Sequence, residues 1–325
     1  MTGKWRRLSA LLTTSALLLV AGCGGAGTAT GSSAKQPGQL SIVTAFYPFA
    51  FVAERVAGSH ALVTTLTQPG AEPHDVELTP RQVGSLSVAD LVVYERGFQP
   101  AVDQAVDQSG ASAVLDTATV VPLEPLGTTP DPHEDGHGHG HEHGHDDGHD
   151  DGALDPHIWL DPTNLARIAT DLAGRLSAMD GEHAADYRAN AARLGRDLGG
   201  LDAEFRRGLA HCSRTEFITT HAAFGYLARR YALTQVGITG LNPDTEPSPS
   251  RIAQIQREAT SRGVTTIFTE TLISPAIARS IAGDLGLVTD VLDPVEGITS
   301  ASRGQDYLAV MRSNLSALEK ANGCS

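Results

Sequence analysis

The sequence predicts an α/β fold with parallel sheets, divided over two lobes that one long helix joins. From Gln39 onward, short apolar runs rich in β-branched residues alternate with stretches of helical periodicity. At 325 residues the chain is long enough for two cores. Between the two alternating regions, residues 182–209 carry apolar side chains at helical spacing, a helix of roughly 40 Å that can run from one domain into the next.

The first alternating region is expected to hold strands at 40–46, 61–66, 91–94 and 112–116, with helices at 48–58, 79–88 and 100–109. Pro80 suits the first turn of its helix, because the amide hydrogen that proline lacks would have no partner there. A helix over 162–179 precedes the long one.

The second region repeats this alternation. Strands are expected at 216–219, 235–237, 264–268 and 287–292, and helices at 222–231, 250–260, 274–285 and 305–320. Ser250 is expected to cap one of these helices, and Ser274-Pro275 to open another as N-cap and first residue. The alternation predicts a second parallel sheet.

The N-terminus has the features of an exported lipoprotein. A basic start is followed by the short apolar run 8–20 and by Val20-Ala21-Gly22-Cys23. The run is too short for a good membrane span and suits a secretory signal. We therefore expect a signal peptide over 1–22, lipidation of Cys23, a flexible tether over 23–39 rich in Gly, Ser, Thr and Ala, and a location on the extracytoplasmic face of the cell membrane.

Charge and composition point to cations as partners. The formal net charge is −14, and 131–151 alternates His, Gly and acids without a single Lys or Arg. This balance argues against nucleic acid. The tract has too few apolar side chains to pack and is expected to be disordered, whereas its imidazoles suit zinc, copper or nickel.

Two cysteines, Cys212 and Cys324, remain after Cys23. An even pair in an oxidising compartment favours a disulfide. A thiolate–metal role stays open, and would need both cysteines near other ligands.

Polar residues recur where strands end. His74 follows the second predicted strand, His221 follows 216–219, Glu270 follows 264–268 and Asp293 follows 287–292, while His157 lies directly after the His-rich tract. Ligands of open parallel sheets bind beyond the carboxyl ends of the strands. Three histidines and a carboxylate form a closed tetrahedral zinc site.

Four motifs carry a family resemblance. They are Gly70-Ala71-Glu72-Pro73-His74-Asp75-Val76-Glu77, Asp155-Pro156-His157-Ile158-Trp159-Leu160-Asp161-Pro162, His221-Ala222-Ala223-Phe224-Gly225-Tyr226 and Leu292-Asp293-Pro294-Val295-Glu296-Gly297. With these motifs in order, the chain from about Ser41 to its end resembles the metal-binding lipoproteins (solute-binding proteins) of bacterial zinc and manganese ABC importers, typified by ZnuA and AdcA.

The resemblance implies two (β/α)4-like lobes with parallel sheets, joined by one long rigid helix, with the metal in the inter-lobe cleft. We expect an N-terminal lobe over 40–180 that includes the loop 131–151, a linking helix over 181–210 and a C-terminal lobe over 211–325. Carried over by position, the ligands are His74, His157, His221 and Asp293, with Glu296 as the competitor for the fourth place. Glu270 and Glu77 are expected to support the ligands or anchor loops.

The resemblance also implies a function. The cargo is Zn²⁺ rather than Mn²⁺, since manganese members tend to carry a carboxylate where His221 stands. The partners are an ABC permease and its ATPase, and we expect a monomer. A zinc hydrolase is disfavoured because G-x-S-x-G and a phosphate loop are missing from the sequence, and because a fourth protein ligand would close the zinc site. We therefore expect no enzymatic activity, and a surface adhesin or metal buffer stays open.

Overall fold

The computed structural model describes residues 35–36, 38–126 and 153–325. The expected signal peptide, the lipidation site Cys23, most of the tether and the His-rich tract lie outside these residues. Over the described part, the predicted architecture of two parallel α/β lobes and a long helix is confirmed.

The N-terminal lobe is built on a parallel sheet with strand order β2-β1-β3-β4. Its strands are β1 (Leu40–Thr44), β2 (Ala61–Thr65), β3 (Leu91–Tyr94) and β4 (Val114–Asp116). The helices are α1 (Tyr47–Ala57), α2 (Pro80–Val88) and α3 (Pro100–Ser109). All four residues of β3 are buried, as expected for an apolar strand in the middle of a sheet covered by helices on both faces. Thr79 and Gln82 cap α2 reciprocally, which fixes where the helix starts.

The C-terminal lobe repeats this plan. Its sheet has the order β10-β9-β7-β8, and its strands are β7 (Glu216–Thr219), β8 (Thr234–Gly237), β9 (Thr266–Thr269) and β10 (Val288–Val291). The helices are α6 (Gly225–Arg230), α7 (Pro249–Ser261), α8 (Ala276–Leu285) and α9 (Tyr307–Asn322). The two sheets have the same topology. In each, the second strand in the chain lies at one edge beside the first, and the third strand lies on the other side of the first.

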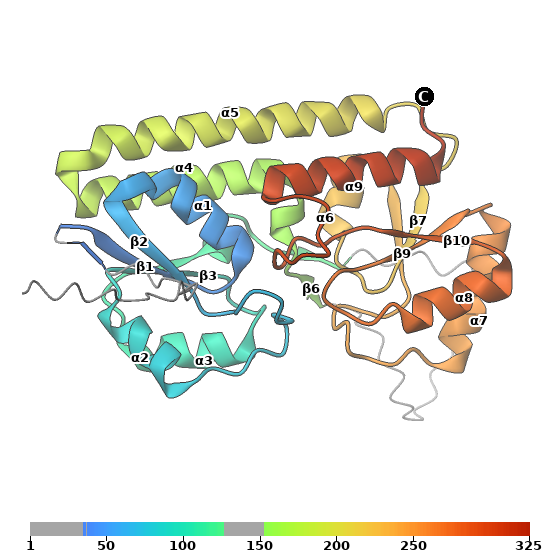
Figure 1. The fold of residues 1–325 in the computed structure, drawn as a ribbon, viewed down its shortest axis with the longest axis horizontal. Coiled ribbons are helices and arrows are strands. Elements are labelled where there is room, and N and C mark those ends of the chain that lie inside the picture. The colour runs from blue at the N-terminus through green and yellow to red at the C-terminus, as the bar shows by residue number, and fades with distance from the viewer. Residues whose placement is uncertain (1–34, 37, 127–152) are drawn as a thin grey trace, which may run out of the picture. The chain divides into compact units, whose positions relative to one another are not determined.

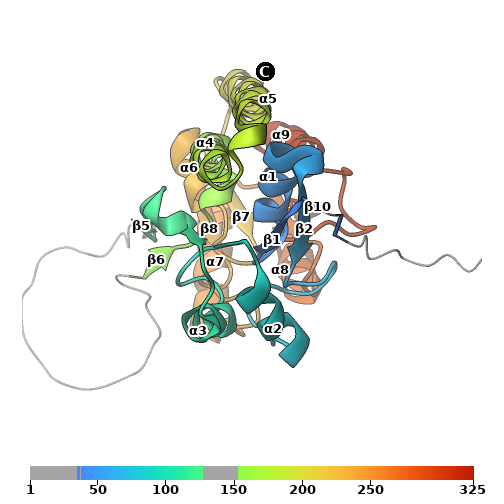
Figure 2. The same cartoon turned by 90° about the vertical axis from the view of Figure 1, so that its left-hand side faces the viewer.

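A helical layer connects the two lobes. Helix α4 (Pro162–Met179) and helix α5 (Ala184–Gly208) pack side by side, and α5 contacts both α1 of the first lobe and α9 of the second. Figure 1 shows α5 extending along both sheets. In Figure 2, α4, α5 and α9 lie on one side of the sheets, and α2, α3, α7 and α8 on the other. Because α5 is anchored to both lobes along its length, it restricts their relative motion.

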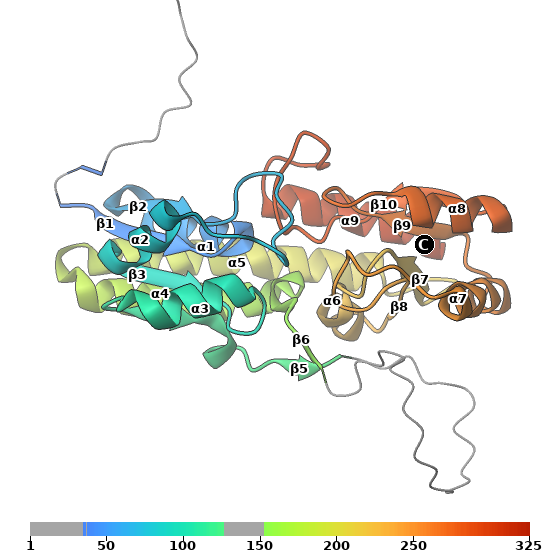
Figure 3. The same ribbon diagram turned by 90° about the horizontal axis from the view of Figure 1, so that it is seen from below.

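A small two-stranded ribbon comes between the first sheet and helix α4 in the chain. Strands β5 (Glu124–Pro125) and β6 (Leu154–Asp155) pair antiparallel at the side of the fold, where Figure 3 shows them next to each other. The sequence did not predict this ribbon, because each strand has two residues and the strands lie far apart in the chain. Short 3₁₀ turns complete the fold at Gly58–His60, Thr117–Thr119, Ile158–Leu160 and Gly181–His183.

The pair Cys212 and Cys324 forms a disulfide across a sequence separation of 112 residues. The bond joins the chain just beyond α5 to the residue that follows α9, so it closes almost the whole C-terminal lobe into one loop. Within the part of the chain that the structure describes, no helix combines the length and apolar character needed to cross a membrane.

Several helices begin at other residues than the sequence predicted. The helix expected from residue 222 begins at Gly225, and the amide of Ala222, ahead of it, donates to the carbonyl oxygen of Gly240. Helix α7 is capped by Ser248 rather than Ser250, because its first residue is Pro249. In α8 the N-cap is Pro275, and Ser274 lies one residue further out.

Candidate metal centre

His74 lies in the loop between β2 and α2. Its amide donates to Glu72 Oε1 (3.0 Å), and the carbonyl oxygen of the preceding Pro73 accepts from Gln99 Nε2 (2.9 Å). The imidazole packs edge-on against Phe98, with ring centroids 4.6 Å apart. The loop is therefore held from both sides, and the ring has one apolar wall.

His157 follows β6 and is completely buried. Asp155 Oδ1 accepts from its backbone amide (3.0 Å) and lies 2.9 Å from its Nδ1. A carboxylate on Nδ1 fixes the tautomer, so Nε2 is left free as a ligand atom. Asp155 also contacts the C-terminal lobe. Arg229 Nη2 lies 3.6 Å from its Oδ2, and α6 lies so close that a Cβ on Gly225 would collide with that oxygen.

His221 stands at the carboxyl end of β7 and is also completely buried. The neighbouring strand β9 is followed directly by Glu270, whose Oε1 accepts from the amide of His221 (3.1 Å) and from Thr220 Oγ1 (2.6 Å). Glu270 Oε2 lies 2.7 Å from His221 Nδ1. The strands β7 and β9 flank the crossover point of the sheet, the place where parallel sheets bind ligands.

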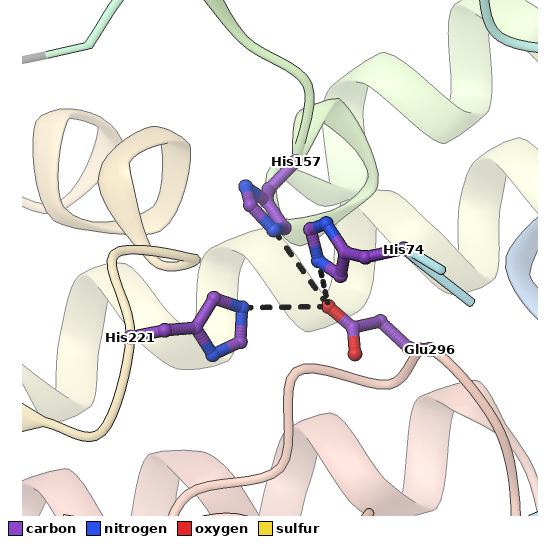
Figure 4. A group of neighbouring side chains, drawn as sticks. All are labelled: His74, His157, His221 and Glu296. Carbon is purple, nitrogen blue, oxygen red and sulfur yellow. Dashed lines mark ion pairs between the residues drawn. The ribbon is translucent and has the colours of Figure 1, made fainter. Parts of the chain in front are cut away.

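Glu296 completes the group. Its Oε1 lies 3.4 Å from His74 Nε2, 3.7 Å from His157 Nε2 and 3.6 Å from His221 Nε2. Figure 4 shows the three imidazoles pointing at this one oxygen from three directions. These separations exceed ordinary hydrogen bonds, but they approach the roughly 3.3–3.5 Å edges of a tetrahedron of ligand atoms about 2.0–2.2 Å from a central zinc.

The four converging atoms are buried, and without a cation between them their burial would cost free energy. Glu296 Oε1 and the Nε2 atoms of His74, His157 and His221 are all buried without a hydrogen-bond partner. Buried polar atoms in native proteins are nearly always paired, because an unpaired one loses its water at a cost of about 1–3 kcal/mol. Together with the ligand atoms' mutual spacing of at most 4.8 Å, this donor set fits a divalent cation.

The pKa values of the candidate ligands are shifted in different directions. Burial would raise the pKa of Glu296, but the neighbouring His221 and His74 imidazoles outweigh this effect and hold the pKa below its usual range. Burial would lower the pKa of His221, yet Glu270 and Glu296 raise it well above its usual value. The pKa of His157 is lowered, because burial outweighs its Asp155 partner. The metal-free site therefore holds its proton on His221 and its negative charge on Glu296.

Further acids surround the centre. Burial and the charge of Glu296 raise the pKa of Glu72 to about 7. Burial, followed by the charges of Asp155 and Asp116, raises the pKa of Glu95 well above its usual range. This accumulation of carboxyl groups behind the imidazoles favours a cation at the centre.

The structure brings three of the four expected ligands together and leaves out the fourth. Asp293 turns its carboxylate away: Oδ1 accepts from the amide of Val295 (2.8 Å) and Oδ2 from Thr271 Oγ1 (3.2 Å). The group of convergent side chains therefore contains Glu296, the alternative that the sequence left open, and not Asp293. Glu270 anchors His221 as expected, whereas Glu77 is exposed.

Asp155 and Glu72 are supporting residues that sequence reasoning missed. Both stand two residues before a ligand histidine and accept a hydrogen bond from its amide. Asp and Glu at this offset were an available signal, because a carboxylate two residues ahead can fix the backbone of a ligand. Asp155 had been interpreted only as one half of an Asp-Pro turn.

Fold and site together define a metal-binding protein of two parallel α/β lobes, with two imidazoles from one lobe and an imidazole and a carboxylate from the other. The chain belongs to the family described as ZnuA, "Zinc-uptake complex component A periplasmic", whose model matches residues 42–321. The resemblance inferred from the four motifs is thereby confirmed.

Individual relatives agree with this family. The chain is 33% identical over 322 residues to the high-affinity zinc uptake system protein ZnuA of Bacillus subtilis, which covers 97% of each protein. It is equally 33% identical to the zinc-binding lipoprotein AdcA of Streptococcus pneumoniae, over 97% of this chain, but it spans only 61% of AdcA.

Solved structures agree as well. Zn(II)-bound AdcA of Streptococcus pneumoniae superposes with a TM-score of 0.71 at 31% identity, covering 88% of this chain and 58% of that one. The laminin-binding protein Lmb of Streptococcus agalactiae, described as an adhesin with metal-transporting activity, gives 0.74 at 28% identity, covering 87% and 99%.

Proposed function

We propose that this protein is an extracytoplasmic solute-binding lipoprotein that captures Zn²⁺ and delivers it to an ABC-type permease. The observation that carries the proposal is the set of four buried, unpartnered ligand atoms that converge on one point. Membership of the zinc-uptake family and similarity to a zinc uptake protein and a zinc-bound lipoprotein support it.

We propose His74, His157, His221 and Glu296 as the zinc ligands. Each imidazole would bind through Nε2, the atom that faces Glu296 Oε1. One carboxylate and three neutral imidazoles leave one positive charge on a bound Zn²⁺, and the nearby Asp155 and Glu270 offset it from behind the rings.

Capture requires displacement of a proton. In the metal-free site His221 is protonated on both ring nitrogens, with Nδ1 beside Glu270 and Nε2 facing Glu296. Zinc would replace the proton on Nε2, while the proton on Nδ1 stays beside Glu270. The buried acid–base network therefore keeps the centre compact before the metal arrives. The exposed fraction of the His74 side chain is 9%, against 0–1% for the other three ligands, which supports entry and exit past His74.

Zinc is favoured over manganese by donor type and number. Imidazole nitrogen suits zinc, whereas manganese prefers oxygen donors and a higher coordination number. Four convergent atoms with three nitrogens provide a closed tetrahedral site with no position for water. A fourth protein ligand also supports a binding role without catalysis, since catalytic zinc keeps an open position.

The remaining parts of the proposal rest on the sequence and the family. Lipidated Cys23 would tether the protein to the extracytoplasmic face of the membrane, and the tether 23–39 would let the lobes reach an ABC permease powered by its ATPase. We further propose that the protein acts as a monomer, since both halves of the metal centre come from one chain.

Metal analysis with competition titration tests the proposal. The soluble protein without residues 1–23 is compared with His157→Ala, Glu296→Gln and Asp293→Asn. We expect one tightly bound zinc, with large losses of affinity for the first two variants and a small loss for the third. Preferential binding of manganese, or full affinity in Glu296→Gln, would contradict it.

An adhesin function is a second candidate, favoured by the similarity to the laminin-binding Lmb. It would share the same metal centre and add binding to a host surface. Titration of the zinc-loaded protein against immobilised laminin distinguishes it from transport alone.

A further inference from the structure

Asp293, although outside the ligand group, is buried and bonded on every side. Its amide donates to Asn314 Oδ1 (2.9 Å), and its carbonyl oxygen accepts from Asn314 Nδ2 (2.7 Å). Its carboxylate accepts hydrogen bonds from the amide of Val295 and from the hydroxyl of Thr271. Helix α9, which carries Asn314, thus fixes the residue from behind, while its carboxylate reaches two different loops.

The first loop is the turn that presents Glu296. Val295 has a φ of +59°, a left-handed conformation that strongly disfavours β-branched residues. The hydrogen bond from the Val295 amide to Asp293 Oδ1 closes the turn at this residue. Glu296 follows immediately, so the direction of its side chain depends on a backbone conformation that Asp293 stabilises.

The second loop follows β9 and belongs to His221. Thr271, which donates to Asp293 Oδ2, is joined by one peptide bond to Glu270. Glu270 accepts from the amide of His221 and lies against its Nδ1. The Asp293 carboxylate therefore connects the two loops that position His221 and Glu296, the two ligands from the C-terminal lobe.

We propose that Asp293 is a positioning residue that joins His221 and Glu296 into one rigid half of the metal centre. The inference rests on the proposed function, because it assumes that these two residues bind the metal. His74 and His157 are held separately, by Glu72 and Asp155. Zinc then leaves when the two N-terminal histidines separate from an intact C-terminal pair.

The test compares Asp293→Asn with Asp293→Ala in the mature protein. Asparagine can still accept from the Val295 amide, and the Thr271 hydroxyl can turn to accept from its NH₂ group. Alanine loses both bonds. We expect zinc affinity, measured by competition with a chromophoric chelator, to fall about 10–100-fold in Asp293→Ala and to be largely retained in Asp293→Asn.

The Co²⁺-substituted protein supplies a readout that a general loss of stability would not move. We expect the visible ligand-field bands of tetrahedral cobalt to be unchanged in Asp293→Asn and shifted in Asp293→Ala. Asn242→Ala is the matched control, because Asn242 Oδ1 accepts the amide of Asp244 in the same kind of two-residue turn, in an exposed loop of the same lobe. We expect it to lower stability without changing affinity or bands.

Thr271→Val tests the link itself. If the Asp293 carboxylate connects the two loops, Thr271→Val weakens zinc binding. Combining it with Asp293→Ala then adds little further loss of zinc affinity. Equal losses in Asp293→Asn and Asp293→Ala, no loss in Asp293→Ala, or additive losses in the double variant would each overturn the proposal. Full affinity in Glu296→Gln would instead refute the ligand set, whatever Asp293 does.

Discussion

Trp159 donates a hydrogen bond from its indole Nε1 to the carbonyl oxygen of Pro294 (2.7 Å). Trp159 lies two residues after His157, and Pro294 two residues before Glu296, so the bond ties a ligand segment of one lobe to a ligand segment of the other. Tyr307 in α9 reinforces the contact, since its hydroxyl donates to the carbonyl oxygen of Trp159 (2.6 Å). The two halves of the metal centre are thus fastened next to the metal as well as through α5.

Replacing Trp159 with Phe tests this fastening. The ring stays apolar and buried, but the carbonyl oxygen of Pro294 loses its donor, which costs about 1–3 kcal/mol of unfolding free energy. We expect zinc to dissociate faster as well, because the two segments can then separate. Urea unfolding and stopped-flow chelation measure the two effects. In Tyr187→Phe, which removes a hydrogen bond to Asp180 away from the metal centre, only the stability should fall.

Zinc affinity should decrease as the pH falls. The pKa of His221 is raised in the metal-free protein by Glu270 and Glu296 against the effect of burial, so its proton is present at neutral pH and must leave. The pKa of His157 is lowered, so that ring is already neutral. We therefore expect proton release on zinc binding near pH 7, and a further weakening below about pH 6, where His157 also takes up a proton. Isothermal titration in buffers of different ionisation enthalpy counts the protons, and constant affinity from pH 8 to 5 would exclude histidine ligands.

Gly225→Ala should disturb the metal centre from outside it. A Cβ at this position would collide with Asp155 Oδ2 and crowd Arg229, so the carboxylate must move away from His157. Loss of such a partner weakens metal binding about 10–100-fold. Gly199→Ala is the matched control: a Cβ there, within α5, meets nothing, and alanine should stabilise the helix by about 0.5–1 kcal/mol without affecting zinc.

Deleting Pro132–Asp151 should leave one tight zinc site, because all four proposed ligands lie outside this tract. The stoichiometry of weaker binding should fall, since the tract contributes seven of the chain's 13 histidines. Metal analysis before and after dialysis separates the two classes of site. Loss of the tight site on deletion would mean that the tract supplies primary ligands.

Much of the fold was predictable from local patterns. The strands Leu91–Tyr94 and Glu216–Thr219 have the expected bounds, because each is a short apolar run with polar or turn residues on both sides. The ribbon of β5 and β6 was not predictable, since two-residue strands on either side of a long polar tract have no periodicity. The start of α6 was also missed, since the residues ahead of Gly225 belong to a loop that a distant contact holds, from the amide of Ala222 to the carbonyl oxygen of Gly240.

The sequence by itself determined the two parallel lobes and the long helix, because apolar periodicity sets the strands and helices. His74 and His221 were expected to meet because each follows a parallel strand, whereas His157, which follows the unpredicted ribbon, was joined to them by the family motif. Only the tertiary structure decided between Asp293 and Glu296. That choice depends on the left-handed backbone of Val295, which helix α9, Thr271 and the buried carboxylate of Asp293 impose from outside the motif. A β-branched residue disfavours this conformation locally, so the motif alone left Asp293 and Glu296 as alternatives.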